Sequence, residues 1–222
     1  DDCSTDNSAS ILKKLQSEYP EVIKLFLQDI NLGITENCNF LLQECKGDYI
    51  CFTAGDDVLN FNCIEIGLNR IINNNSIAIV FHNNIKIDSN SNEILSKKKT
   101  IKEHIGSARI FFKKGIYVQV NGMLVRRSCI PLAGYDSSLK LGSDFDFVIK
   151  VLGSNNKFLC LNNKLSKYRI HSNSITKLRE LECKLDVLNG ILNLLTRYPE
   201  YSYELMSLAS IRFRSIRKFN FE

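Results

Sequence analysis

The hydrophobic positions of the chain follow two alternating patterns. Apolar residues recur at helical spacing over residues 11–19, 34–45, 61–72 and 143–151. Between these segments, apolar runs at 22–27, 49–53 and 77–87 predict strands. Strands that alternate with helices are typical of an α/β domain, in which buried parallel strands lie between helical layers. We therefore expect an α/β fold with a mixed, mostly parallel sheet flanked by helices.

The second half of the chain is less regular. Residues 101–112 favour a helix, 117–126 have the alternation of a strand, and 158–161 and 166–170 predict two short strands. After Thr176 the pattern changes from alternating strands and helices to helices alone. Leucines from Leu178 to Leu195 recur at helical spacing, and a second helix is expected after Pro199. We interpret residues 1–176 as one domain and 177–222 as a C-terminal helical appendage.

The C-terminal end is basic and amphipathic. Its charged and apolar residues are Arg212, Arg214, Arg217 and Lys218 with Phe213, Ile216 and Phe219. Such a helix can make a peripheral contact with an anionic membrane surface. The alternative, which we favour slightly, is a helix packed on its own domain. No apolar run approaches the roughly 18 residues of a transmembrane helix.

Composition narrows the functional classes. The chain has 222 residues, 44% of them hydrophobic and 24% charged, which is the balance of a folded globular protein. A net charge of +5 permits an anionic partner, but no nucleic-acid-binding motif is present. The eight cysteines form no C-x-x-C pair, so we expect reduced thiols in a cytosolic protein. We read Lys97–Lys99 as a solvated loop.

Acidic residues cluster after predicted strands or in the loops beside them. The clusters are Asp1–Asp2, Asp56–Asp57, and Asp144 with Asp146. Ligands of α/β sheets bind at the carboxyl ends of strands, and adjacent carboxylates repel unless a cation lies between them. Magnesium and manganese prefer such oxygen ligands. Each pair alone could equally cap a helix. The three clusters together predict a divalent cation site, with Mn²⁺ or Mg²⁺ as cofactor.

Five motifs, in order, resemble those of family 2 glycosyltransferases. They are Asp1-Asp2-Cys3-Ser4-Thr5-Asp6; Asn31-Leu32-Gly33 with Asn37 and Asn39; Gly47-Asp48-Tyr49-Ile50 with Gly55-Asp56-Asp57; Arg126-Arg127-Ser128 with Gly134-Tyr135-Asp136 and Ser143-Asp144-Phe145-Asp146; and Tyr168-Arg169-Ile170-His171 with Ser174. The resemblance extends to about Thr176. It implies a GT-A fold, a nucleotide-sugar donor, and inverting transfer to a hydroxyl of a glycan or lipid-linked acceptor. We expect this in surface polysaccharide synthesis, at the cytoplasmic face of the membrane.

The resemblance also implies a role for individual residues. Asp1 and Asp2 would contact the nucleotide base and ribose, Asp56 with Asp57 would bind the metal, and Asp144 would be the catalytic base. Asp146 is a rival base by spacing and is otherwise assigned to substrate binding. Arg126 and Arg127 would bind the diphosphate, although one of them could be a surface residue. His171 would hold the metal or diphosphate, and a structural role is the alternative.

The sequence departs from the family pattern at four places. Ala54 replaces the first carboxylate of the metal motif, Ser143 replaces the usual glutamate before the base, and Phe40 stands where a basic residue is common. The first strand and helix of the family are missing before Asp1, and there is no start methionine, so we expect an N-terminally incomplete domain. These departures keep two alternatives open, namely a non-catalytic nucleotide-sugar or glycan binding relative and a nucleotidyltransferase.

Overall fold

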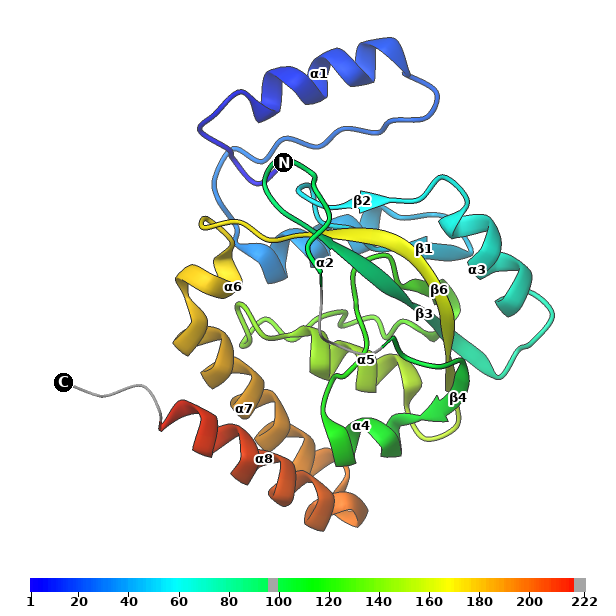
Figure 1. The fold of residues 1–222 in the computed structure, drawn as a ribbon, viewed down its shortest axis with the longest axis vertical. Helices are drawn as coiled ribbons and strands as arrows, with labels where there is room; N and C mark the ends of the chain where they lie inside the picture. The colour runs from blue at the N-terminus through cyan, green and yellow to red at the C-terminus, as the bar shows by residue number, and fades with distance from the viewer. Residues whose placement is uncertain (96–99, 218–222) are drawn as a thin grey trace.

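The computed structural model describes residues 1–95 and 100–217 (Figure 1). Lys97–Lys99, Lys218 and Phe219 lie outside the described residues. The helices are α1 (Ser8–Glu18), α2 (Ile34–Glu44), α3 (Cys63–Ile71), α4 (Ala108–Lys114), α5 (Asp144–Leu152), α6 (Ile175–Leu178), α7 (Glu180–Arg197) and α8 (Ser202–Ile216). The strands are β1 (Tyr49–Cys51), β2 (Val58–Leu59), β3 (Ile77–Ile87), β4 (His104–Ser107), β5 (Leu124–Arg126) and β6 (Lys157–Arg169). Short 3₁₀ turns span Arg127–Cys129 and Pro199–Tyr201.

The strands form one mixed sheet. Its order is β1-β5-β3-β6-β2, with β4 also paired to β6. The long central strands β3 and β6 are parallel, whereas the other pairings among the described residues are antiparallel. The mixed α/β prediction is confirmed, but the expected parallel majority is wrong. The reason is the direction of the shorter strands, because β2, β4 and β5 all run opposite to the central pair.

Helices cover both faces of the sheet. Successive side chains of a strand point to opposite faces, so β3 sends Phe81 toward α4 and α5 and sends Val80 toward α3. The first face holds the larger core, in which Phe81 meets Phe111 and Phe158 edge to face, and those two rings are tilted against each other. Helix α5 buries seven of its nine residues, and this places it deep between the sheet and α7.

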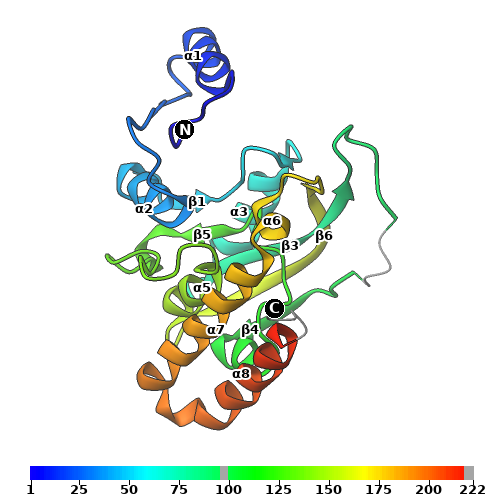
Figure 2. The ribbon, with the colours of Figure 1, turned by 90° about the vertical axis from the view of Figure 1, so that its left-hand side faces the viewer.

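The two C-terminal helices pack side by side below α5 in both views (Figures 1 and 2). Ile191 and Leu194 of α7 and Leu205 of α8 are completely buried and belong to the same core as α5. Packing of the last helix on its own domain, the alternative that we favoured slightly, is therefore what the structure shows for α8. A boundary at residue 176 stays a prediction. No helix among the described residues is long and apolar enough to cross a membrane.

The N-terminal segment differs from the prediction. The expected strand at 22–27 is absent, and this stretch is an extended loop. The Asp1 ammonium donates to the Phe26 carbonyl, and the Gln28 amide donates to the Asp1 carbonyl. Extended backbone becomes a strand only where a neighbouring strand satisfies its hydrogen bonds over several residues. Residues 1–34 include no buried residue, and α1 stands apart from the sheet in both views (Figures 1 and 2).

Three other segments also differ from their predictions. Residues 101–112 hold β4 followed by α4, because residues 104–107 pair with the free edge of β6. The predicted strands at 158–161 and 166–170 are one strand, since register shifts opposite Phe81–Asn84 accommodate the polar stretch between them. The predicted strand at 117–126 is confined to β5.

Candidate active site

The first part of the site is a turn between β1 and β2. The turn presents Asp56, whose carboxylate Oδ2 lies 3.0 Å from Nε2 of His171, just past the end of β6. The two side chains are 47% and 25% exposed. Residues 115 positions apart in the sequence thus form one polar pair at the surface. The structure brings together these two predicted metal-binding residues.

Arg169 fastens this turn to the sheet. Its backbone N–H donates to Oδ1 of Asp57 at 2.8 Å, and its Nε donates to the backbone carbonyl of Asp56 at 2.7 Å. Its guanidinium also donates to the carbonyl of Asp88 at 3.0 Å, in the turn after β3. One side chain therefore connects the acidic turn, the end of β6 and the end of β3. Arg169 lies in the motif with His171, but the sequence predicted no role for it. The only signal in the sequence was its place two residues before His171.

Asp57 faces inward beside Asp56. It is half-buried, and burial raises its pKa above the usual value, while the hydrogen bond from the Arg169 amide opposes that shift. One of its oxygens is already used by this amide. Asp57 thus supports the turn, whereas Asp56 presents its carboxylate to solvent.

The turn fits a cation held by few protein ligands. Among residues 1–95 and 100–217, no group of three or more His, Cys, Asp or Glu side chains is arranged to hold a metal ion. Asp56 and His171 offer one carboxylate and one imidazole. Magnesium-type sites commonly use one or two carboxylates and complete their coordination with substrate phosphates and water. The donor set present is compatible with such a site and not with a closed protein cage.

The second part of the site is the start of α5. Asp144 is the first residue of this helix, and the residue as a whole is exposed to solvent. The protein around its carboxyl group nevertheless desolvates that group and raises its pKa to about 6. Burial, followed by the charges of Asp144 and Asp2, raises the pKa of the Cys38 thiol to about 11. The negative charges of Asp2 and Asp144 thus both raise the pKa of this one thiol on α2. A carboxyl with a pKa of about 6 can hold a proton and release it near neutral pH.

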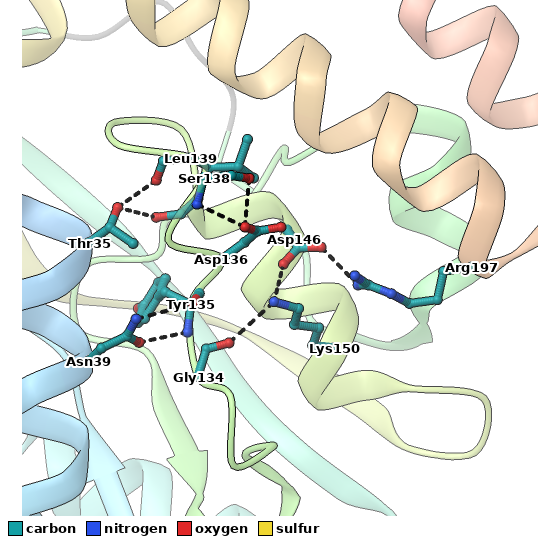
Figure 3. A network of polar contacts seen from close by, with 11 residues as sticks. Thr35, Asn39, Gly134, Tyr135, Asp136, Ser138, Leu139, Asp146, Lys150 and Arg197 are labelled. Carbon is teal, nitrogen blue, oxygen red and sulfur yellow. Dashed lines mark hydrogen bonds and ion pairs between the residues drawn. The ribbon is translucent and has the colours of Figure 1, made fainter.

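Asp146 has a different environment two residues later. Its carboxylate is completely buried and forms ion pairs with Lys150 at 2.6 Å and with Arg197 of α7 at 2.9 Å (Figure 3). A buried carboxylate bound by two cations is not accessible to a substrate or to an acceptor proton. The structure therefore does not support the predicted role of Asp146 in substrate binding, or as a rival base. It joins α5 to α7 instead.

Asp1 and Asp2 both make local hydrogen bonds. The carboxylate of Asp1 accepts bonds from the backbone and hydroxyl of Ser4 at 2.9 and 2.6 Å. The carboxylate of Asp2 accepts bonds from the backbone amides of Leu32 and Gly33 at 2.7 and 2.9 Å. These bonds hold the first motif against the second. The remaining lone pairs of both half-buried carboxylates are available for a ligand.

Arg126 and Arg127 lie at the other end of the sheet. Arg126 donates to the carbonyls of Ile71 and Ile77 at 2.8 and 3.3 Å, beside the first residue of β3. The acidic turn meets the opposite end of β3, on the order of 30 Å along an eleven-residue strand. Arg127 donates to the carbonyl of Gly47 at 2.7 Å. The structure thus does not bring these arginines to the Asp56–His171 pair, and their contacts are structural.

A polar network connects α2 to α5 (Figure 3). The side-chain amide of Asn39 accepts a bond from the Tyr135 amide at 2.8 Å and donates to the Tyr135 carbonyl at 3.1 Å. Thr35 donates to the carbonyl of Leu139 at 2.6 Å and lies 3.3 Å from the hydroxyl of Ser143. Ser143, the residue that replaces the usual glutamate, is therefore a buried member of this network and directly precedes Asp144.

Comparison with known proteins identifies the fold first. The structure matches that of Staphylococcus aureus TarS in complex with UDP-GlcNAc, with a TM-score of 0.61 and 17% identity over 87% of this chain and 56% of TarS. It also matches GalNAc-T7 with UDP, GalNAc and Mn²⁺, with a TM-score of 0.63 and 13% identity over 86% of this chain and 40% of that protein. These likenesses confirm the GT-A fold.

The sequence then identifies the family. The model of glycosyl transferase family 2 matches residues 1–131, more than half of the chain, and the chain belongs to this family. It is 27% identical over 173 residues to an uncharacterised glycosyltransferase of Methanocaldococcus jannaschii, covering 77% of the chain and 58% of that relative. It is 28% identical over 156 residues to an Escherichia coli chondroitin synthase, covering 68% of the chain and 21% of that relative. The expectation of a glycosyltransferase-type enzyme domain is confirmed.

Proposed function

We propose that the chain carries out metal-dependent, inverting transfer of a sugar from a nucleotide-sugar donor to a hydroxyl of a glycan or lipid-linked acceptor. The observation that carries this proposal is Asp144, an exposed residue at the start of α5 whose carboxyl is desolvated by the surrounding protein, which raises its pKa to about 6. Ionised Asp144 takes the proton of the acceptor hydroxyl as its oxygen attacks the anomeric carbon. The donor bond to the diphosphate breaks in the same displacement, which inverts the anomeric centre.

A single displacement requires no nucleophile from the protein. The sulfur of Cys63 lies 3.5 Å from Nε2 of His82, but both residues are buried, with 4% and 2% of their surface exposed. This thiol–imidazole pair is closed to a sugar. Because this pair is closed to a sugar, we give it no part in the reaction and propose direct attack by the acceptor.

Asp56 and His171 are the residues that would hold the divalent cation, manganese or magnesium. Such an ion supplies positive charge to the departing nucleoside diphosphate. Arg169 keeps the Asp56 turn in place, and Asp2, already ordered by two backbone amides, is available to the nucleoside. We infer donor recognition at this end of the sheet.

The surroundings of the reaction are also part of the proposal. We infer a role in surface polysaccharide synthesis at the cytoplasmic face of the membrane, with peripheral contact through the basic C-terminal helix. The support is that α8 exposes Phe213, at 54%, beside the exposed Arg214. At an anionic membrane surface, the exposed phenylalanine would contact lipid and the exposed arginine would lie near the lipid headgroups.

The test compares two aspartate variants in a donor-turnover assay with a panel of nucleotide-sugars, with and without Mn²⁺. We expect Asp144→Asn to lower turnover by roughly 10²–10⁴-fold, because the acceptor proton has no base. Asp48→Asn is the control, an exposed carboxylate before β1 at the opposite end of the sheet, and should keep full activity.

Three outcomes separate the functional classes. Unchanged turnover in Asp144→Asn overturns the assignment of the base. Calorimetric binding of nucleoside diphosphate without turnover by the wild-type chain favours the non-catalytic relative, which Ala54 and Ser143 suggest. Release of pyrophosphate from a nucleoside triphosphate and a sugar phosphate instead favours nucleotidyl transfer.

A further inference from the structure

A cavity of about 480 Å³ lies between β4 and α4, away from the site described above. Strand β4 pairs with residues 157–160 at the start of β6, whereas the Asp56–His171 pair meets the end of that strand. From residue 160 to Arg169 the strand extends roughly 30 Å. The cavity is therefore separate from the donor end of the sheet.

The rim of the cavity carries three lysines, Lys102, Lys113 and Lys114. Within residues 1–95 and 100–217, none of the three forms an ion pair with a carboxylate. The neighbouring carboxylate of Glu103 is bound by Arg70 instead. Three lysines thus line one hollow, and no carboxylate among the described residues pairs with them. Such a concentration of charge attracts anions.

The walls are apolar or already satisfied. Ile101 and Ile110 line the cavity together with the ring of Tyr117. His104 donates from Nδ1 to the Lys102 carbonyl at 2.8 Å, and its Nε2 lies 2.7 Å from the Tyr117 hydroxyl, which donates to it in this tautomer. The polar atoms of the two rings are therefore used by each other and by the backbone.

This arrangement discriminates between classes of ligand. The Tyr117 ring is stacked on His104, with centroids 6.0 Å apart, and the Lys114 ammonium lies 5.4 Å from the same ring. A nucleobase or a sugar would need a free aromatic face or several free hydrogen-bonding groups, and these walls provide neither. An anionic head on an aliphatic body matches the charge of the rim and the isoleucine walls.

We propose that this cavity binds the phosphate headgroup of an anionic phospholipid and docks the protein on the membrane. Lysine ammoniums bind phosphate as point charges, and their aliphatic stems with Ile101 and Ile110 cover the first part of the acyl chain. Helix α8 packs on α4 and exposes Tyr203, Met206 and Phe213. The inference deepens the proposed membrane contact by naming a lipid site, and it does not depend on glycosyl transfer.

The test uses the full chain and vesicles of phosphatidylcholine with or without phosphatidylglycerol, at low salt because screening weakens surface charge. Lys102→Gln/Lys113→Gln/Lys114→Gln removes the rim charges and keeps the stems. The control Lys13→Gln/Lys14→Gln/Lys164→Gln removes the same net charge from exposed lysines of α1 and β6. Each lysine near an anionic membrane contributes about fivefold, so the cavity variant should lose affinity on the order of 100-fold. The control should lose much less.

A soluble arm separates lipid from free phosphate. Short-chain phosphatidylglycerol below its micelle concentration should bind the wild-type chain in calorimetry, and glycerol phosphate alone should bind at least tenfold more weakly. Equal binding of the two probes overturns the lipid assignment, because the apolar walls then contribute nothing. Equal losses in the two triple variants overturn the cavity as the site.

Two further readouts keep this inference distinct from the others. If Phe213→Ser abolishes vesicle binding while the cavity variant binds normally, contact through α8 stands and the lipid cavity is rejected. Donor turnover without vesicles should be unchanged in the cavity variant. A failure of donor turnover in every chain, wild type included, would count against the proposed transfer and leave the vesicle result intact.

Discussion

Two acidic pairs, one in the β1–β2 turn and one at the start of α5, share one arrangement. In each pair the first residue, Asp56 or Asp144, is exposed, and the carboxylate of the second, Asp57 or Asp146, is bound within the structure. The supports differ. Asp57 accepts one backbone amide at 2.8 Å, whereas Asp146 is completely buried between two cations.

This difference indicates what each second carboxylate contributes. The turn is an open surface loop, so a single amide and the Arg169 side chain are sufficient to order it. Helix α5 lies in the core, so the charge of Asp146 had to be neutralised where water is absent. Adjacent acidic residues in a motif thus need not share one function. One performs the chemistry and its neighbour positions the backbone.

The largest effect should come from separating the pair on α5. Asp146→Asn leaves Lys150 and Arg197 without their charge partner. We expect a loss of about 3 kcal/mol of unfolding free energy, the low end for a buried pair, because the Arg197 side chain is 38% exposed. Asp144→Asn should not destabilise the fold. Urea unfolding of both variants measures the contrast. Similar losses in the two would show that Asp146 has no special structural role.

A smaller effect should separate the pair in the turn. Asp56→Asn removes a carboxylate that faces His171, and we expect the manganese requirement of donor turnover to rise by about 10–100-fold, the range found when groups around a metal are removed. Asp57→Asn retains an oxygen that accepts the Arg169 amide, so it is the matched control. An equal rise in both variants would contradict the division of roles.

The smallest effect concerns pH. The Asp144 pKa is raised to about 6 in the folded chain, so turnover should rise as pH increases through 6 and then level off. A carboxyl with a raised folded pKa contributes stability below its unfolded pKa, and this contribution is lost as pH rises through about 6. Asp144→Asn should therefore be more stable than the wild type at pH 7.5 and not at pH 3.5. Paired thermal melts at the two pH values test the sign.

Much of the fold follows from local pattern. The residues at helical spacing in α2, α3, α5 and α7 do form helices, and the predicted strand at 77–87 is β3. The failures share one cause, since a pattern shows an apolar surface and not what will cover it. Residues 22–27 have no strand to pair with, and α1 leaves Ile11 57% exposed, whereas α7 buries Ile191 completely.

The site shows the same division between residue type and environment. The motifs predicted which carboxylates and which histidine belong to the site, and the structure joins Asp56 to His171. They did not indicate that Asp146 is neutralised by Arg197, 51 positions away, or that Arg126 serves backbone carbonyls beside β3. Such partners depend on how distant elements pack, and no local spacing records them.

The Asn39–Tyr135 clamp has a consequence for how this family can diverge. Gly134 precedes the clamp at a φ of +58°, and a Cβ there would lie 2.4 Å from the Asn39 side-chain oxygen. Two effects thus disfavour any other residue at position 134, namely the positive φ of the backbone and the Asn39 side chain of α2. A side chain at position 134 would therefore be accepted only if residue 39 changed with it.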